Sequence, residues 1–477
     1  MEKDVQQASA ETKRVAGCLI AATNSGCGKT TITMGLLRSL KRRQLNVQPF
    51  KCGPDYIDTQ YHRIASGCES VNLDTWFASE RHIKQVFEHY GQQADVCVVE
   101  GVMGLYDGYC RWHGSSGEIA HLLHLPVVLV VNARSMAFSV APILYGYKHF
   151  AMKGDSGQDA PLELAGVIFN QVGSERHKQL LRSACDEVGL RCLGMIPRVP
   201  DMQIPSRHLG LTLENKQLIE TLVEKAAAVV EEYVDVDGLL EMMRDGIYQK
   251  PKETPIKPHH KGELHSGMLP IGIESIFPVA HKRDDNSQGG MCARILMARD
   301  EAFNFVYREN IDVLRQCGEV VFFSPLHDQM LPPATDFLYL PGGYPEFFLE
   351  QLSANEAMRN SIREYIEQGG RCLAECGGMM YLCQHVAGED GRKFPMVGVL
   401  NQDATMVGMH LHLGYRTFKF EGRTWRGHEF HYSSVPNPDN ACTLPIEISD
   451  GHGNMVDSKV YKCKNLLASY IHLYWGE

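Results

Sequence analysis

The chain has 477 residues, 44% hydrophobic and 22% charged, which excludes wholesale disorder and predicts roughly two to four globular domains. With 47 Lys and Arg against 57 Asp and Glu, the formal net charge is −10, so charge gives no reason to expect nucleic acid or an anionic membrane as a partner. The 15 cysteines include no CxxC pair, no signal peptide is recognisable and no apolar run is bilayer-length, so we expect a cytoplasmic protein without a disulfide scaffold.

The first half of the chain alternates strand-like apolar runs with helix-like stretches. A strand is predicted over Val15–Ala22 and a helix from Thr30 to about Arg42, and further strands over 95–100, 126–132 and 164–170. These runs are continuously apolar, which is typical of a parallel sheet covered on both faces, and the intervening segments are long enough for crossover helices. We therefore predict an α/β domain with a doubly wound parallel sheet over residues 1–245.

A glycine-containing turn, TNSGCGKTT, lies between the first strand and the first helix. In a P-loop, backbone N–H groups at the helix start bind phosphate, and Gly26 and Gly28 allow close approach. Lys29 would reach the terminal phosphates, and the Thr30 hydroxyl would ligate Mg²⁺. Thr23 replaces the usual first glycine, so a glycine-rich turn without a nucleotide is the alternative. The residues expected to bind ATP are Asn24, Ser25, Gly26, Cys27, Gly28, Lys29, Thr30 and Thr31.

Acidic residues follow the next predicted strands. Glu100 ends an apolar run, at the carboxyl end of a strand, where ligands bind in open α/β sheets. Asp55 and Asp58 occur in KCGPDYID, and Asp107 occurs in GVMGLYDG. Each aspartate taken alone is equally well interpreted as a turn former or helix cap. Beside a P-loop, the cluster predicts a metal and substrate rim, because adjacent carboxylates and a triphosphate repel one another unless a cation lies among them.

The composition of the sequence changes at residues 246–290, which are rich in Pro, Lys and His and show little periodicity. We predict a linker there. From Arg294 the strand–helix alternation restarts, with strands predicted in ARILMARD, VVFFSPL, FLYLPGG and RCLAECGG and a helix over 354–368. A second α/β domain is therefore predicted over residues 291–477.

Cys376 lies between a predicted strand and a predicted helix and is followed by two glycines. This arrangement resembles a nucleophile elbow, in which the N–H of the next residue, Gly377, serves an oxyanion hole. The positive end of the helix is expected to lower the pKa of the thiol. The candidate base is His472, because a thiol needs one to form thiolate. The loop LPGGYPE offers a second oxyanion donor at Gly343.

A buried structural cysteine is the alternative for Cys376, since most of the 15 cysteines must be structural. Cys372 and Cys383 are predicted to lie in the core. Two histidine pairs are interpreted as ordinary surface or core residues rather than metal ligands, because no cysteine stands at zinc spacing beside them. They are His410 with His412 and His428 with His431.

Taken together, these motifs resemble those of the CbiA-type amidotransferases, which make cobyrinate a,c-diamide in cobalamin biosynthesis. The shared segments follow the family's order across nearly the whole chain and include TNSGCGKTT, FKCGPDYIDTQYH, EGVMGLYDG, LYLPGGYPE, AECGGMMYL, GHEFHYS and ASYIHLYW. The resemblance implies an N-terminal ATP-dependent synthetase domain similar to dethiobiotin synthetase. It also implies a C-terminal flavodoxin-like, class I glutaminase domain of the CobB/CobQ type.

The resemblance also implies residue roles. Cys376 would hydrolyse glutamine with His472 as base, and the ammonia would pass internally to the first domain. There ATP would phosphorylate a carboxylate of a corrinoid, cobyrinic acid, and ammonia would displace the phosphate, at the a and then the c position or the reverse. A homodimer is compatible with this reading. The implied Mg²⁺ ligands are Thr30, Asp55 and Glu100, and the residues implied for substrate and phosphoryl transfer are Asp55, Tyr56, Asp58 and Asp107. Asn170 would bind adenine. Glutamine would be bound by His431, Tyr432 and Ser433.

One departure concerns the base. Typical class I glutaminases carry a Glu two residues after the catalytic His, whereas His472 is followed by Leu473 and Tyr474. What orients His472 therefore stays open. Rival functions are the same a,c-diamidation of Ni-sirohydrochlorin, amidation of the remaining corrin side chains, a P-loop regulatory ATPase with an inert C-terminal domain, and a cysteine hydrolase with a degenerate P-loop. The KCGPDYID segment argues against the second, and the Cys376/His472 pair against the third.

Overall fold

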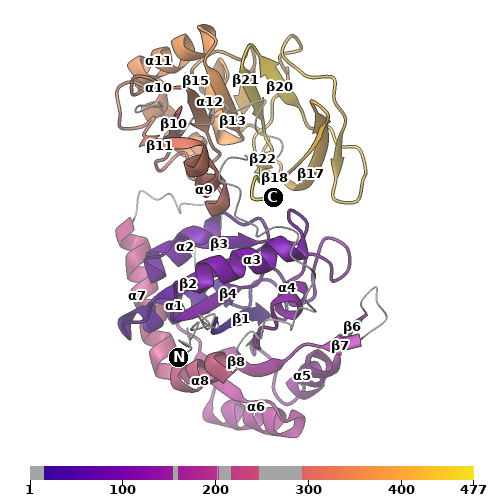
Figure 1. Cartoon of the computed structure of the whole chain (residues 1–477). Coiled ribbons are helices and arrows are strands. Elements are labelled where there is room, and N and C mark those ends of the chain that lie inside the picture. Colours follow the sequence, from indigo (N-terminus) through magenta and orange to yellow (C-terminus); the bar gives the residue numbers. More distant parts are fainter. Residues whose placement is uncertain (1–14, 154–158, 201, 203–215, 246–292) are drawn as a thin grey trace, which may run out of the picture. The chain divides into compact units, whose positions relative to one another are not determined.

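The computed structural model describes residues 15–153, 159–200, 202, 216–245 and 293–477. The described residues form two compact units (Figure 1). Unit 1 contains residues 15–200 and 217–245, and unit 2 contains residues 293–477. The predicted linker, 246–290, lies outside the described residues. The predicted fold class is confirmed, because each unit is an α/β structure built on a largely parallel sheet.

Unit 1 contains a seven-stranded, fully parallel sheet with strand order β3-β2-β4-β1-β5-β8-β9. The strands are β1 Gly17–Ala22, β2 Val47–Cys52, β3 Val71–Leu73, β4 Val96–Glu100, β5 Val127–Asn132, β8 Leu164–Val172 and β9 Cys192–Pro197. The helices are α1 Lys29–Arg42, α2 Ile57–Ser66, α3 Glu80–Gly91, α4 Ser116–Leu123, α5 Val140–His149, α6 Glu175–Val188, α7 Lys216–Tyr233 and α8 Val236–Asp245. A short antiparallel pair, β6 Ala151–Lys153 and β7 Asp159–Pro161, follows α5.

The central strands are buried along their whole length, as continuous apolar runs predict for a sheet covered on both faces. In β4 the burial includes Glu100, which pairs in register with Ile20 of β1 and Lys51 of β2. Because the strands are parallel, their carboxyl ends meet at one edge, and this edge carries the polar cluster described below. The strands predicted over 95–100, 126–132 and 164–170 are confirmed to within two residues.

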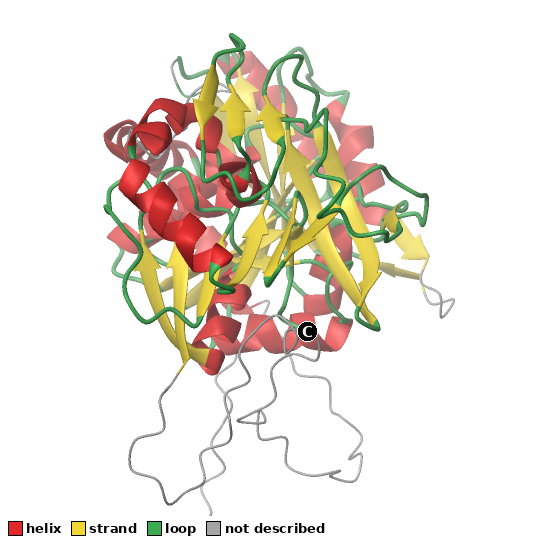
Figure 2. Ribbon diagram, turned by 90° about the horizontal axis from the view of Figure 1, so that it is seen from above, coloured by secondary structure: helices red, strands yellow, loops and turns green. Residues whose placement is uncertain are grey.

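Unit 2 contains a six-stranded sheet with order β11-β10-β12-β13-β21-β20, in which only β20 runs antiparallel to its neighbour. Its strands are β10 Ala293–Ala298, β11 Gly318–Phe323, β12 Phe337–Leu340, β13 Arg371–Glu375, β20 Val460–Cys463 and β21 Leu466–Ser469. The helical segments are α9 Arg308–Cys317, the 3₁₀ helix η3 Pro345–Phe348, α10 Leu349–Ala354, α11 Glu356–Glu367 and α12 Gly377–Leu382. Figure 2 shows helices in red beside the yellow strands.

Two smaller sheets complete unit 2. One is antiparallel with order β19-β17-β18-β22, and the other has order β15-β14-β16. Neither was located from the sequence. The strands are β14 His385–Ala387, β15 Lys393–Pro395, β16 Asp403–Thr405, β17 His412–Phe420, β18 Arg423–His431, β19 Ile448–Asp450 and β22 His472–Leu473.

The core of unit 2 lies on both faces of the six-stranded sheet. Leu296 and Leu338 belong to one apolar cluster, whereas their chain neighbours Ile295 and Phe337 belong to another. Successive strand residues point to opposite faces, so both faces are covered. The prediction that Cys372 and Cys383 are core residues is confirmed, because both are fully buried in the first of these clusters.

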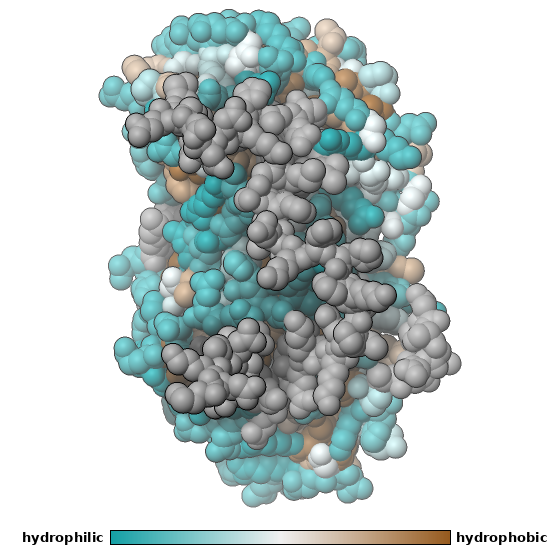
Figure 3. Space-filling view, viewed as in Figure 1, coloured by the Kyte–Doolittle hydropathy of each residue, from teal (hydrophilic) through white to brown (hydrophobic). Residues whose placement is uncertain are grey.

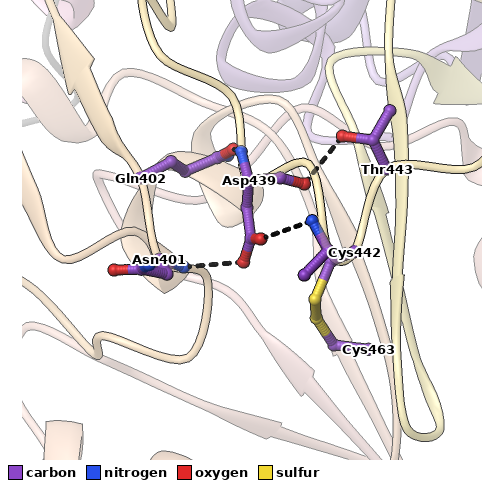
Figure 4. The surroundings of a disulfide bond; sticks show 7 residues. Asn401, Gln402, Asp439, Cys442, Thr443 and Cys463 are labelled. Carbon is purple, nitrogen blue, oxygen red and sulfur yellow. Dashed lines mark hydrogen bonds between the residues drawn. A yellow bond between two sulfur atoms is a disulfide. The ribbon is translucent and has the colours of Figure 1, made fainter.

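A disulfide bond joins Cys442 and Cys463, whose Cα atoms are 5.3 Å apart (Figure 4). One pair is not a disulfide scaffold, but the pairing itself was not predicted. The nearby Asp439 carboxylate is buried and accepts hydrogen bonds from the backbone N–H groups of Asn401 (3.0 Å) and Ala441 (3.1 Å).

Most of the exposed side chains in Figure 3 are hydrophilic. In the part of the chain that the structure describes, no helix has the length and hydropathy needed to cross a membrane.

Candidate functional site

The turn between β1 and α1 has a conformation that requires glycine at two positions. Gly26 and Gly28 have φ values of 81° and 92°, in the left-handed region that side chains disfavour. At Gly28 an added Cβ would lie 2.3 Å from Nδ2 of Asn170, so a side chain there would also collide with β8. The Lys29 ammonium, at the start of α1, donates to the backbone oxygen of Met103 (2.7 Å). The turn therefore has the shape that phosphate binding by backbone N–H groups needs.

Asn170 contacts this turn directly. Its Nδ2 donates to the backbone oxygen of Cys27 (2.9 Å), and its Oδ1 accepts from the N–H of Gln171 (2.9 Å). The side chain thus fixes the phosphate turn against β8. Recognition of adenine by Asn170 stays a prediction.

We predict that Gly28→Ala weakens nucleotide binding and does so more than Gly26→Ala. The new methyl group would occupy the position of the Asn170 amide and would force a residue with positive φ into strain, so the turn must shift. The expected result is a loss of ATP affinity of at least about tenfold, measured by equilibrium binding, because about 1–3 kcal/mol of strain is introduced. Gly26→Ala is the matched control, since it has positive φ but nothing within 4 Å of its Cβ. Equal effects of the two substitutions would contradict the role given to the contact with Asn170.

A buried polar cluster lies at the carboxyl edge of the sheet, centred on Glu100, which is fully buried. One oxygen, Oε1, accepts from the Thr30 hydroxyl (2.7 Å) and from the Lys51 ammonium (3.0 Å). The other, Oε2, contacts Nε2 of His62 (2.7 Å). Lys51 also forms an ion pair with Asp58 (2.5 Å). The phosphate turn and the acidic rim are therefore one connected site.

The charges in this cluster stabilise one another. Burial alone would raise the pKa of Glu100, but Lys51 and His62 outweigh it and keep that pKa well below the usual range. Burial opposes the charge on Lys51, but Asp58 and Glu100 prevail and raise its pKa. Burial and the nearby Lys51 lower the pKa of Lys29. Glu100 and Lys51 are thus an ionised pair inside the protein.

The predicted Mg²⁺ ligands lie in different settings. Thr30 and Glu100 are in direct contact, and Oδ2 of Asp58 lies 3.4 Å from the Thr30 hydroxyl. The Oδ1 of Asp55 instead accepts the backbone N–H groups of Ile57 (2.8 Å) and Asp58 (2.9 Å), so this carboxylate caps α2. Hydroxyl and carboxylate oxygens are the ligands that Mg²⁺ prefers, and the residues present fit that ion.

The two remaining residues predicted for the substrate side have structural contacts of their own. Asp107 accepts the N–H of Gly104 (3.0 Å) and thereby closes the turn that follows β4. Tyr56 is buried at the start of α2. The alternative interpretation of single aspartates as turn formers or caps thus describes Asp107 and Asp55. Their roles toward a substrate stay predictions.

Sequence reasoning missed Lys51 and His62. Both are fully buried, and both contact Glu100. Two signals were present in the sequence. Lys51 is a charged residue in a strand that is otherwise mostly apolar, and His62 follows Asp58 by four residues, which places both on one face of α2. His62 also contacts the Ser70 hydroxyl through Nδ1 (3.0 Å), so both ring nitrogens have partners.

In unit 2, Cys376 occupies a strained turn between β13 and α12. Its φ of 46° and ψ of −108° are unusual for a residue with a side chain and are typical of a nucleophile elbow. Its N–H donates to the backbone oxygen of Ser469 (2.7 Å), and its sulfur lies 3.8 Å from the backbone oxygen of Phe430. The side chain is buried.

Two glycine turns pack against each other beside this cysteine. A Cβ added at Gly377 would lie 3.1 Å from both the nitrogen and the oxygen of Gly343, so the two predicted oxyanion donors are neighbours. A Cβ added at Gly342 would lie 2.1 Å from Cε1 of His472. The Gly342–Gly343 turn is thus contacted by the imidazole of His472 and by the residue after Cys376. The structure brings the predicted nucleophile, base and oxyanion donors to one turn.

The helix start was predicted to lower the pKa of the Cys376 thiol, but the net shift of that pKa is upward. Burial raises the pKa of Cys376 well above its usual value, and Glu346 raises it further. The N–H of Gly377, at the start of α12, lowers this pKa but does not offset the effect of burial. Burial also lowers the pKa of His472 to about 3, with a contribution from His428. At neutral pH the site therefore contains a thiol and a neutral imidazole.

The residues predicted to bind glutamine lie beside Cys376, directly after Phe430. The His431 ring stacks between His412 (centroids 4.7 Å apart) and Tyr470 (3.7 Å). Nδ1 of His431 contacts the backbone oxygen of Ser433 (2.9 Å), whose hydroxyl donates to Tyr470 (2.9 Å). Tyr432 is half-buried. Glutamine binding by residues 431–433 stays a prediction.

Neither histidine pair belongs to a group of three or more close potential metal ligands among the described residues. His410 precedes β17, which begins at His412. Among described residues, the group of potential ligands that lie close enough together is Asp439, Cys442 and Cys463, and its two cysteines form the disulfide.

Comparisons with known proteins agree with this division into two sites. The family model described as the CobQ/CobB/MinD/ParA nucleotide binding domain matches residues 18–211, and the CobB/CobQ-like glutamine amidotransferase domain matches residues 294–477. The cobyrinate a,c-diamide synthases of Synechococcus sp. and Dehalococcoides mccartyi are each 37% identical, over 96% of this chain and 95% of theirs. The hydrogenobyrinate a,c-diamide synthase of Brucella ovis is 36% identical, over 96% of this chain and 98% of its own.

Proposed function

We propose that this chain, which belongs to the family of cobyrinate and hydrogenobyrinate a,c-diamide synthases, uses ATP and glutamine to amidate two side-chain carboxylates of a corrinoid. The corrinoid is cobyrinic acid, and the carboxylates are those at the a and c positions. Membership makes the chain a glutamine-dependent amidotransferase of the ligase class in cobalamin biosynthesis. The observation that supports the proposal most is the presence, in one chain, of a P-loop joined to Glu100 and of a cysteine elbow beside His472.

The chemistry of unit 1 follows from the poor reactivity of a carboxylate toward an amine. One carboxylate oxygen of the corrinoid would attack the γ-phosphorus of ATP, ADP would leave, and an acyl phosphate would form. Lys29 would contact the terminal phosphates. Of the residues predicted to hold Mg²⁺, we keep Thr30 and Glu100 and put Asp58 in place of Asp55, because the Asp55 carboxylate accepts backbone N–H groups at the start of α2. The ion would offset the charge of the phosphate oxygens. Ammonia would then attack the acyl carbon, and phosphate would leave to give the amide.

The chemistry of unit 2 would supply that ammonia. The thiol of Cys376 would add to the side-chain amide carbon of glutamine as its proton passes to His472. The N–H groups of Gly343 and Gly377 would stabilise the oxyanion. The imidazolium would return the proton to the leaving nitrogen, ammonia would depart, and water would hydrolyse the thioester to glutamate. Ammonia made in a sheltered site stays unprotonated and nucleophilic, whereas free ammonia at neutral pH is mostly ammonium.

The test is an assay of the purified full chain with glutamine and ATP-Mg²⁺, followed by mass spectrometry. We expect two successive exchanges of OH for NH₂ on the corrinoid. Parallel reactions contain cobyrinic acid, hydrogenobyrinic acid or Ni-sirohydrochlorin, because relatives bear both of the first two names and the motifs leave the third open. If only Ni-sirohydrochlorin changed in mass, it would replace cobyrinic acid as the proposed substrate. ATP hydrolysis independent of glutamine and of every macrocycle would favour a regulatory ATPase.

A further inference from the structure

The strand that carries His472 is very short. β22 consists of His472 and Leu473, and it pairs with β18 through Gly427 and His428. A β-ladder of only two residue pairs does little by itself to hold the β22 strand rigid. The sequence also lacks an acidic residue two positions after His472. The contacts of the neighbouring backbone therefore bear on the position of this imidazole.

Buried side chains bind both backbone groups of Leu473. The N–H of Leu473 donates to Oε1 of Glu375 (3.0 Å), and its carbonyl oxygen accepts from Nδ2 of Asn310 (2.7 Å). Oδ1 of Asn310 also accepts the N–H of Trp475 (2.9 Å). Glu375 and Asn310 are each 1% exposed. The segment around His472 is thus attached to the core by two side chains.

Glu375 has a second partner and a notable place in the chain. Its Oε2 accepts from the hydroxyl of Tyr339 on β12 (2.7 Å), and the Tyr339 ring packs against Trp475 (centroids 5.1 Å apart). Glu375 is also the last residue of β13 and directly precedes Cys376. One carboxyl group therefore links the strand of the nucleophile with the strand of the base.

This link leaves the imidazole little freedom. The ring of His472 lies against Gly342, where even a Cβ atom would collide with it, and near the ring of Phe305 (centroids 6.2 Å apart). A ring that is packed in this way keeps one orientation only as long as its own backbone stays in place. The backbone contact at Leu473 is the one made by Glu375.

We propose that Glu375 is the positioning residue for His472, fixing the imidazole relative to Cys376 through the backbone of Leu473. The assignment rests on the proposed roles of Cys376 and His472 in glutamine hydrolysis. Glu375 contacts neither imidazole nor substrate in this network, so it acts through the strand. A buried carboxyl group that merely stabilised the fold would not affect turnover by folded molecules.

The test compares two substitutions of Glu375 in the full chain. Glu375→Gln keeps an oxygen for the Leu473 N–H and a polar group for Tyr339, whereas Glu375→Met fills the same volume and removes both hydrogen bonds. We expect Glu375→Met to lower kcat of glutamine-dependent amidation about 100-fold with KM for glutamine within about twofold, because small misplacement of a catalytic group has effects of that size. Glu375→Gln should stay within about fivefold of the parent, and ammonium-dependent amidation should be unchanged in both.

Asp439 supplies the matched control. It is also a buried carboxylate of unit 2 that accepts backbone N–H groups, those of Asn401 and Ala441, and these do not belong to β22. Asp439→Leu should lower the melting temperature as Glu375→Met does, but kcat of the folded fraction should not change. If Glu375→Met does not fold, Tyr339→Phe removes one of the two bonds and should lower kcat about three- to tenfold.

The outcomes separate the two claims. If Glu375→Met folds and its kcat equals that of the parent, the positioning role is overturned while the glutaminase function stands. If Glu375→Met does not fold, an unchanged kcat in Tyr339→Phe has the same consequence. Equal losses in Glu375→Met and Asp439→Leu would also overturn it. A parent chain that amidates its substrate with ammonium but never with glutamine would overturn the proposed function of unit 2 and the positioning role together.

Discussion

Replacing Cys376 by serine should abolish glutamine-dependent amidation and leave ammonium-dependent amidation intact. The serine hydroxyl is far less acidic than a thiol, and the thiol pKa is already raised by burial and Glu346, so the neutral imidazole of His472 is a poor match for an alcohol. We expect the glutamine-dependent rate to fall by at least about a thousandfold, as removal of other covalent nucleophiles does. The ammonium-dependent rate depends on unit 1 and should stay within about twofold.

The measurement is amide formation with glutamine or with ammonium chloride at fixed ATP-Mg²⁺. Cys317→Ser is the matched control, because Cys317 is buried in the same unit and its sulfur lies 3.0 Å from the backbone oxygen of Val313, a hydrogen bond that a hydroxyl can also make. Loss of both activities in folded Cys376→Ser would contradict a design with two separate sites. Retention of the glutamine-dependent rate would show that the nucleophile lies elsewhere.

The fold was predictable wherever burial forced a continuous apolar run. The strands around Val98, Leu129 and Phe169 lie in the middle of a sheet covered on both faces, so their sequences are apolar throughout. The four-stranded antiparallel sheet of unit 2 was not predicted. Its long strand β17 has exposed residues at its start, and β22 has only two residues, so neither gives a periodic pattern that a sequence can reveal.

In the two sites, too, features set by adjacent residues were predictable, whereas contacts between residues distant in sequence were not. The tight turns at Gly28 and Cys376 were predicted correctly, because the residues that form each turn are adjacent in the sequence. Lys51, His62 and Glu375 were missed because their roles arise from neighbouring strands and helices. Lys51 meets Glu100 only through the pairing of β2 with β4, and Glu375 meets Leu473 across 98 residues of sequence.

Replacing Lys51 by methionine should both destabilise unit 1 and abolish amidation with either nitrogen donor. Lys51 is 1% exposed and is the cation between Asp58 and Glu100, so methionine fills its volume but leaves two buried carboxylates without that charge. Removal of one partner of a buried ion pair costs about 3–5 kcal/mol. The carboxylates would also repel the phosphates of ATP more strongly, so nucleotide binding should weaken. Thermal unfolding and ATP binding measure the two effects.

A second substitution tests the cause of this loss. In Lys51→Met/Asp58→Asn the carboxylate that lost its ion pair with Lys51 is neutral, so part of the lost stability should return, roughly 1–2 kcal/mol. Activity should not return, because Asp58 borders Thr30 and Lys51 contacts Glu100. The glutaminase reaction of unit 2 should be unchanged in both variants and reports that the rest of the chain is folded. If the single variant were as stable as the parent, Glu100 and Asp58 would not depend on Lys51 for their charge.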